Sequence, residues 1–549
     1  MEIQRRFLIS WRRYEEWLAK KQPTAAELAR QASVAASWDD PPRISFLTPV
    51  WNVAPSVLEA TIQSVRAQSA PHWELCLADG CSKDQRLRDI MARHAAEDRR
   101  IKTVFLPENL GISGNSNAAL ALATGDYVAI LDHDDVIAPD FVFLVAERIV
   151  ADRSLDIVYV DEDKVSADGT RHLEPWFKPG WSPETLLCAN YLMHSVFRAR
   201  LVRDLGGFDP ATDGSQDWDL AFRLTERTDA VAHVPRVLYH WRMVPASTAS
   251  SGAAKPKVYL SQEAAIRRHL ERLGVPEPKV DAHHPGLIRS TWTTPPANVL
   301  VVVWGSSPPA RLAACLRALC KTTRHPRWRA LVPATPGDPR WQAALAVGDP
   351  RVQPTSAVPW DAARTQADGM VALLADDLLV QDADWLEELE RWTRRPGAAA
   401  VAGAVHYPDG NIVATGRVLG PTGSAVPLFE GMQDHFSLFG STTWYRRHLV
   451  VAPDLVAIPA TALAAQGTPA SADLDEMLAV FCLRARQAGQ HAMFTPCAKA
   501  VRPGQPRPFD GGLFHEAARA DRSLVPAADP YANPALAWFL SEPMLPRLK

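Results

Sequence analysis

The 549-residue sequence lacks several features that would narrow its class at once. Its seven cysteines are scattered without a Cys-x-x-Cys pair, which argues against structural zinc and favours a reducing compartment. The formal net charge is only −3, so we expect no nucleic-acid partner. No run of about 18 uncharged apolar residues occurs, and no signal-peptide cleavage site follows the first residues. These absences predict a soluble, cytoplasmic protein.

The composition that is present is that of a large globular protein, with 47% hydrophobic and 22% charged residues. A chain of this length exceeds one ordinary hydrophobic core, so two or more domains are expected. Apolar strand patterns alternate with helical patterns, which predicts α/β sheets covered by helices. We expect a helical segment at 1–40, a first domain at 41–275, a proline-rich linker at 276–297, a second domain at 298–505 and a tail at 506–549.

The N-terminal segment carries aromatic and apolar residues at helical spacing: Phe7, Trp11, Tyr14 and Leu18. Lysines and arginines surround them, so the helix could lie on anionic lipid or pack against the next domain. Two successive glutamates in the same stretch weaken the lipid alternative. We therefore expect the helix to pack on the protein.

The stretch YVAILDHDD is an apolar strand that ends in three aspartates, Asp132, Asp134 and Asp135. Carboxylates this close raise one another's pKa unless a positive charge sits among them. Ligands bind beyond the carboxyl ends of parallel strands, and Mg²⁺ or Mn²⁺ bridges such carboxylates to phosphates. For an isolated Asp-x-Asp, a solvated loop or a helix cap is the more common explanation. The interpretation therefore depends on the neighbouring motifs.

The second half of the chain repeats the plan of the first. The stretch PPANVLVVVW from Pro295 parallels PPRISFLTPVW from Pro41, and MVALLADDL from Met370 parallels YVAILDHDD. The local similarity is weak, but length and order agree. The pattern predicts a tandem duplication.

Six motifs keep their order through the first half: TPVWN, LADGCS, ENLGISGNSNAAL, ILDHDD, GSQDWDLAFRL and VLYHWR. Between Arg43 and Thr248 they resemble the family-2 glycosyltransferases, in particular bacterial members that build O-antigens, rhamnans and other surface polysaccharides. The resemblance implies the GT-A fold, a Rossmann-like mixed sheet covered by helices, here in two copies. It further implies inverting transfer from a UDP- or dTDP-sugar, with rhamnose as one candidate, to a surface polysaccharide or lipid-linked glycan. A lipid-linked acceptor would bring the protein to the inner face of the membrane.

The resemblance assigns donor binding to residues at strand ends and in loops. Thr48 and Pro49 would begin the nucleotide pocket, and Asp79 would accept a hydrogen bond from a pyrimidine N–H. The other donor-binding candidates are Asn109, Gly111, Asp132, Lys178 and Arg242. A bidentate arginine would neutralise phosphate well, although both basic residues could instead be ordinary surface charges.

The resemblance also assigns the metal and the base. Asp132, Asp134 and His240 would hold a divalent metal, Mg²⁺ or Mn²⁺, on the donor diphosphate; the histidine could instead be a core residue. Asp217 would be the general base that takes the proton from the acceptor hydroxyl. The usual glutamate before this base is a glutamine here, and Asp219 is the alternative base.

The second copy has lost these residues. Counting from the arginine of the matching helix motif, Leu478 stands at the place of the base, and Val501 stands at the place of the histidine. Asp376 and Asp377 remain, without a complete Asp-x-Asp. Apolar side chains can neither accept a proton nor bind metal, so we expect a degenerate domain that binds acceptor glycan, positions a partner or stabilises the first domain.

Two other classes of function fit the sequence less well. A non-catalytic glycan-binding or scaffold protein would suit the second domain, but the first keeps its acids and its histidine. A nucleotidyltransferase would carry a glycine-rich loop with lysine or arginine after the first strand, and TPVWNVAPS has no such loop.

Overall fold

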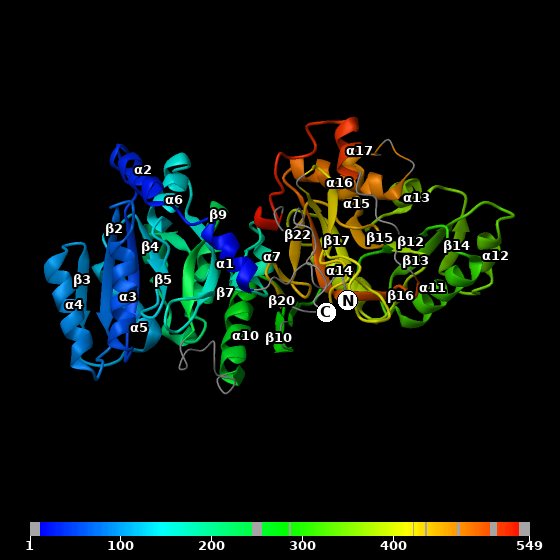
Figure 1. Ribbon diagram of the computed structural model, residues 1–549. Helices are drawn as coiled ribbons and strands as arrows, with labels where there is room; N and C mark the ends of the chain where they lie inside the picture. Colours follow the sequence, from blue (N-terminus) through cyan, green and yellow to red (C-terminus); the bar gives the residue numbers. More distant parts are fainter. Residues whose placement is uncertain are drawn as a thin grey trace, which may run out of the picture. The chain divides into compact units, whose positions relative to one another are not determined.

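The computed structural model in Figure 1 describes residues 11–243, 255–284, 287–420, 422–433, 436–467, 469, 471, 473–504 and 513–536. The chain forms two compact units. The N-terminal unit comprises Ile9–Val275 and Val280–His283, and the C-terminal unit comprises Pro276–Lys279 and His284 onward. Among the described helices, none has the length and apolar character needed to cross a membrane.

The N-terminal unit contains a nine-stranded mixed sheet of order β3-β2-β1-β4-β8-β6-β9-β5, with β7 paired to β6. Its strands are β1 (Ile44–Val50), β2 (Trp73–Asp79), β3 (Ile101–Phe105), β4 (Tyr127–Ile130), β5 (Val136–Ile137), β6 (Ile157–Val165), β7 (His172–Trp176), β8 (Val196–Arg198) and β9 (Val231–Arg242). Its helices are α1 (Trp11–Ala19), α2 (Ala25–Ala36), α3 (Pro55–Arg66), α4 (Gln85–Glu97), α5 (Gly111–Leu122), α6 (Phe141–Ala151), α7 (Pro183–Leu186), α8 (Ala199–Asp204), η2 (Pro210–Thr212), α9 (Gln216–Thr225) and α10 (Lys255–Arg272).

The centre of this sheet explains its local sequence. Every residue of β1 and β2 is buried, as expected for parallel strands covered on both faces. Helix α3 begins with Pro55 in its first turn, where the missing N–H costs no hydrogen bond. It then buries Leu58, Ile62 and Val65 along one face. The sheet order changes direction between β1 and β4, so their carboxyl ends form a crevice of the kind that binds ligands.

The C-terminal unit repeats the same strand permutation, β14-β13-β12-β15-β23-β17-β24-β16, with β22 paired to β24. Its strands are β12 (Val299–Trp304), β13 (Trp328–Pro333), β14 (Val352–Thr355), β15 (Met370–Ala375), β16 (Leu379–Val380), β17 (Ala398–His406), β18 (Gly416–Leu419), β19 (Ala425–Leu428), β20 (Phe436–Ser437), β21 (Gly440–Ser441), β22 (Arg446–His448), β23 (Leu455–Pro459) and β24 (His491–Val501). Its helices are α11 (Pro309–Thr322), α12 (Pro339–Leu345), α13 (Pro359–Gln366), α14 (Trp385–Thr393), α15 (Ala460–Gln466), α16 (Leu474–Gln487) and α17 (Leu513–Ala520). Strands β10 (Lys279–His284) and β11 (Leu287–Thr291) occupy the segment where the chain passes from one unit to the other.

The strand registers of the two sheets match as well as their order. The first strand pair begins with Ile44 opposite Tyr127 in one unit and with Val299 opposite Met370 in the other. The prediction of two tandem copies of one α/β fold is therefore confirmed.

Helix α1 packs on the protein, which is the alternative that we expected. Tyr14, Trp17 and Leu18 are each less than 9% exposed. The Trp17 ring meets the ring of Phe177 edge to face, with 5.2 Å between their centroids. Phe7 lies outside the described residues.

Candidate active site

The site is built around the crevice between β1 and β4. Thr48 and Pro49 lie near the carboxyl end of strand β1, and both are buried. The ring Nδ1 of His133 lies 2.8 Å from the main-chain oxygen of Pro49, which joins the end of β1 to the loop after β4. The Thr48 hydroxyl oxygen has no hydrogen-bond partner among the described residues, although it is fully buried. A buried hydroxyl in this position is available to a ligand.

Asp79 ends β2 on the same edge and is completely buried. One of its oxygens accepts a hydrogen bond from the Ser82 N–H at 3.1 Å, and the other accepts one from Arg88 Nε at 2.9 Å. The loop therefore holds this carboxylate in a fixed orientation. Its predicted partner, a pyrimidine N–H, would have to share an oxygen with one of these donors.

Asn109 and Gly111 form a second loop beside the first. The Asn109 side-chain oxygen accepts bonds from the Gly111 N–H at 3.1 Å and from Asn115 Nδ2 at 2.9 Å. Gly111 has φ +76°, and a Cβ at this position would lie 2.7 Å from an Asp213 oxygen. Glycine is thus required twice, by backbone conformation and by space.

The three aspartates after β4 lie in different environments. Asp135 is fully buried and accepts hydrogen bonds from the Tyr239 hydroxyl at 2.6 Å and from the Arg242 N–H at 2.7 Å. Burial, together with the charges of Asp132 and Asp134, raises the pKa of Asp135 well above its usual range. Burial also raises the pKa of Asp134, and the charge of Asp132 adds to this effect. The cluster thus favours binding of a cation, which would relieve the repulsion.

Arg242 is 5% exposed and is used within the protein. Its Nε donates to the main-chain oxygen of Asp134 at 2.9 Å, and its Nη1 donates to the main-chain oxygen of Ala167 at 3.2 Å. The guanidinium therefore holds the metal-site loop in place. The bidentate phosphate contact of Arg242 stays a prediction.

Lys178 is likewise buried, with its Nζ 2.8 Å from a Glu162 oxygen. The same oxygen lies 2.8 Å from His194 Nδ1. Burial alone would raise the pKa of Glu162, but the charges of Lys178 and His194 lower it to about 2. Lys178 thus keeps Glu162 ionised, and Glu162 orients His194.

His194 was missed by the sequence analysis. Its ring stacks on Tyr239 with 3.6 Å between centroids. One ligand atom each of His194, Asp132 and Asp135 lies within 4.8 Å of the others, which is a spacing that suits a metal ion. Its orienting partner Glu162 stands in the acidic run of β6, and those acids were the only signal that a histidine network existed here.

Asp217 lies in the first turn of α9 and is half-buried. Asn190 Nδ2 donates to its Oδ2 at 2.8 Å. Burial raises the pKa of Asp217, and the nearby charges of His194 and Asp132 act on it in opposite directions. The alternative base, Asp219, is buried and forms an ion pair with Arg223 at 2.7 Å. Of the two acids, Asp217 is the one beside the strand-end cluster.

His240, a predicted metal ligand, and its neighbour Tyr239 lie on opposite sides of β9. Tyr239 and His240 are successive strand residues, so their side chains point to opposite faces. Tyr239 faces Asp135, whereas His240 Nδ1 lies 2.6 Å from Asp163 on β6. His240 pairs with Val136 of β5, which lies two residues after Asp134 in the sequence.

These residues fit a divalent metal. Carboxylate oxygens of Asp132 and Asp134 are hard ligands of the kind that Mg²⁺ and Mn²⁺ prefer. The Nδ1 of His240 is already bonded to a carboxylate, which is the usual arrangement when the other ring nitrogen binds a metal.

The chain is similar to several known proteins. A family model described as "Glycosyl transferase family 2" matches residues 45–203. "Uncharacterized protein y4gI" of Sinorhizobium fredii (strain NBRC 101917 / NGR234) is 34% identical over 88% of this chain and 55% of its own length. "O-antigen biosynthesis protein RfbC" of Myxococcus xanthus is 30% identical over 80% of this chain and 35% of its own. The chain thus spans about half of one curated relative and about a third of the other.

A shorter relative is matched over most of its length. "Putative glycosyltransferase EpsE" of Bacillus subtilis (strain 168) is 30% identical over 37% of this chain and 73% of EpsE. Among solved structures, S. aureus TarS 1-349 in complex with UDP-GlcNAc is 20% identical and covers 42% of this chain and 66% of its own, with a TM-score of 0.35. A TM-score this low supports no structural argument. From the family match, the EpsE relationship and the repeated sheet order, the chain belongs to glycosyl transferase family 2 and carries two tandem domains of the GT-A fold.

Proposed function

We propose that the N-terminal unit is an inverting, metal-dependent hexosyltransferase. It moves a sugar from a UDP- or dTDP-sugar to a growing bacterial cell-surface polysaccharide or lipid-linked glycan. The observation that supports the proposal is that Asp217 lies near the strand-end acids. The charge of Asp132 acts on the Asp217 carboxyl. Membership of the family and the similarity to a protein named for O-antigen biosynthesis support it.

The donor nucleotide would lie over the carboxyl ends of β1 and β2. There Thr48 offers its buried hydroxyl, and Asp79 offers a carboxylate fixed by Arg88. Asn109 and Gly111 would shape the neighbouring wall. Asp132, Asp134 and the Nε2 of His240 would hold the divalent ion, which stabilises the negative charge that develops on the departing diphosphate.

Asp217 then acts as the general base. Asn190 binds one carboxylate oxygen and leaves the other for the acceptor hydroxyl. As the acceptor oxygen forms its bond to the anomeric carbon, the bond from that carbon to the diphosphate oxygen breaks, and the hydroxyl proton passes to Asp217. A single displacement inverts the anomeric centre. A pKa raised by burial makes this carboxylate a stronger base than an ordinary aspartate.

Lys178 and Arg242 would contribute through the contacts described above. Lys178 keeps Glu162 charged and thereby orients His194. Arg242 fixes the loop that carries Asp134. Both residues would thus stabilise the predicted donor site through contacts within the protein.

We propose that the C-terminal unit does not catalyse transfer and instead holds acceptor glycan, positions a partner or stabilises the first unit. A lipid-linked acceptor would bring the protein to the cytoplasmic face of the cell membrane. The competing proposal, a non-catalytic scaffold, is decided by the same experiment.

The test is nucleotide release from a panel of UDP- and dTDP-sugars, with a lipid-extract acceptor, with and without Mn²⁺. Asp217→Ala and Asp134→Ala are measured beside Asp89→Ala, which removes an exposed aspartate on α4. Metal-dependent release from one donor that only the first two variants lose supports the proposal. Release that survives Asp217→Ala moves the base elsewhere. No release and no nucleotide binding by the unaltered protein supports the scaffold.

A further inference from the structure

Helix α1 reaches the predicted metal ligand His240 through a shared carboxylate. The Tyr14 hydroxyl, on α1, donates to Asp163 Oδ2 at 2.5 Å. The other oxygen of the same carboxylate lies 2.6 Å from His240 Nδ1. Tyr14 and Asp163 are 149 residues apart in sequence, and both side chains are buried.

Asp163 receives a third donor from β7. His172 Nδ1 lies 2.8 Å from Oδ2, the oxygen that also accepts from Tyr14. The separations at His172 and His240 are those of direct hydrogen bonds. The Asp163 carboxylate thus has three hydrogen-bond partners, Tyr14, His172 and His240.

The contact with Asp163 determines which nitrogen of His240 is free. The carboxylate accepts the Nδ1 proton, so Nε2 presents a lone pair, and the ring is held in one orientation. A carboxylate with three donors has little freedom to rotate. Removal of one donor therefore loosens the carboxylate and, with it, the direction in which Nε2 points.

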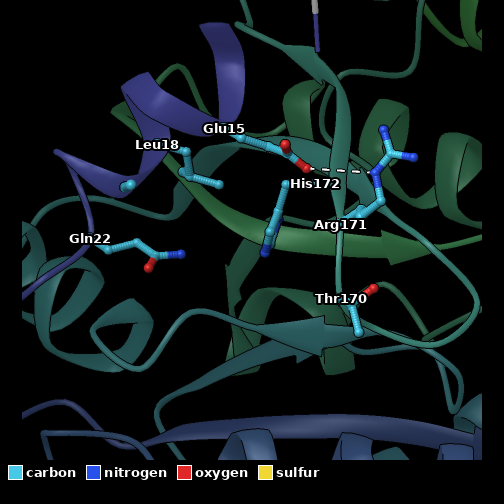
Figure 2. Close-up of a pocket in the computed structure, with 7 residues that line it drawn as sticks. Glu15, Leu18, Gln22, Thr170, Arg171 and His172 are labelled. Carbon is cyan, nitrogen blue, oxygen red and sulfur yellow. Dashed lines mark ion pairs between the residues drawn. The ribbon is translucent and has the colours of Figure 1, made fainter. Parts of the chain in front are cut away.

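Helix α1 lies beside β7, close to this contact. A cavity of about 560 Å³ lies between α1 and the segment that leads into β7. Figure 2 shows Glu15, Leu18 and Gln22 on one side of it and Thr170, Arg171 and His172 on the other. Glu15 and Arg171 form an ion pair of 3.8 Å across it. Residues 45–203, matched by the family model, do not include α1.

We propose that Tyr14 is a positioning residue of the donor-metal site: its hydroxyl holds Asp163, which holds His240 for the metal. This inference rests on the proposed function, specifically on metal binding by His240. It makes α1 part of the machinery of the N-terminal unit.

The experiment compares Tyr14→Phe with the unaltered full-length protein. Free Mn²⁺ is measured by electron paramagnetic resonance in the presence of UDP, and turnover is measured against Mn²⁺ concentration. Loss of a direct partner of a ligating histidine weakens metal binding by about 10–100-fold. We therefore expect Asp163→Asn to fall in that range and Tyr14→Phe to weaken Mn²⁺ binding by about 3–10-fold. Excess Mn²⁺ restores the kcat of Tyr14→Phe, a result that general structural damage would not give.

Two matched variants separate this effect from other losses. Tyr127→Phe removes a buried hydroxyl that donates to the Leu155 main-chain oxygen, and Glu15→Gln breaks the ion pair on the same helix. Both should bind Mn²⁺ as the unaltered protein does. If His240→Ala leaves Mn²⁺ binding unchanged, the metal assignment of the proposed function fails. If His240→Ala weakens binding but Tyr14→Phe does not, the inference about Tyr14 alone is overturned.

Discussion

The two units carry acids at the same place in the same fold and neutralise them differently. In the C-terminal unit, Arg340 pairs with Asp376 at 2.5 Å, and Arg502 pairs with Asp377 at 3.1 Å. In the N-terminal unit, the aspartates after β4 form no ion pair with lysine or arginine in the part of the chain that the structure describes. The C-terminal acids are thus paired directly with arginines, whereas the N-terminal acids are the proposed site of a divalent cation.

The register shows that this difference extends to the neighbouring strands. Leu379 pairs with Val501 where Val136 pairs with His240, so Val501 occupies the histidine position, as the sequence predicted. The partner strand agrees, because His406 pairs with Val501 where Asp163 pairs with His240. The C-terminal unit therefore lacks both the predicted histidine ligand and the carboxylate that contacts it in the N-terminal unit.

The residue at the position of the predicted general base also differs between the two units. Leu478 on α16 is fully buried in the hydrophobic core, while Asp217 on α9 is half-buried beside charged neighbours. An apolar residue at this position improves packing and cannot accept a proton. A fold can thus keep its architecture while the chemistry at the strand ends is replaced by internal ion pairs and apolar contacts.

The largest expected effect is on catalysis in the N-terminal unit. Asp217→Asn keeps the size of the side chain and removes the base, so we expect kcat to fall by about 10²–10⁴-fold. The assay is nucleotide release at saturating donor and Mn²⁺. Asp89→Asn, on the exposed face of α4, serves as control. A variant that retains full activity would break the contrast drawn between Asp217 and Leu478.

The next effect is on stability in the C-terminal unit. Arg502 is buried and pairs with Asp377 and with Asp454, so Arg502→Met leaves two carboxylates without their partner. We expect a loss of about 3–5 kcal/mol in the free energy of unfolding, measured in urea with hydrogen exchange to locate it in this unit. Arg86→Met, in an exposed pair, should cause no measurable change. Equal behaviour of the two variants would contradict the role given to Arg502.

A third effect concerns pH and the acids of β6. The pKa of Glu162 is lowered from 4.5 to about 2, so its stabilising contribution is complete above about pH 4.5 and is lost as the pH falls towards 2. Glu162→Gln removes that contribution. The difference in unfolding free energy between the two proteins should therefore shrink between pH 4.5 and 2, as measured in urea.

Val405 of the C-terminal unit stands where Glu162 stands in the first, because it lies one residue before His406 in the matching register. The acid-dependent difference should accordingly be confined to peptides of the N-terminal unit in hydrogen exchange. Glu147→Gln, at an exposed position of α6, provides the matched control. A difference that stays constant across this pH range would show that Glu162 does not act as described.

The smallest expected effect compares one strand-end aspartate from each unit. The pKa of Asp135 is raised by burial and by Asp132 and Asp134, so ionising it costs stability at neutral pH. Asp135→Asn should stabilise the metal-free protein by on the order of 1 kcal/mol. Asp377→Asn should destabilise it, because Arg502 loses a charged partner. Urea unfolding without divalent metal checks both, and the same sign for the two variants would remove the distinction.

The sequence predicted the tandem α/β plan, the strand-end acids and the losses at Leu478 and Val501. These features are local: apolar strands, helical spacing and the residue types at strand ends can be recognised within short windows. Asp217 was distinguishable from Asp219 only by motif, and the structure adds the reason, since Asp219 is paired with Arg223.

The tertiary structure alone decided how the charges are shared. Glu162 with Lys178 and His194, and Asp163 with Tyr14 and His240, come from segments far apart in the chain. Which of these side chains meet depends on the pairing of β6 with β9 and on the packing of α1 against β7. Because successive strand residues face opposite sides of the sheet, one residue of register separates the Tyr239 network from the His240 network, and no local pattern in the sequence specifies that register.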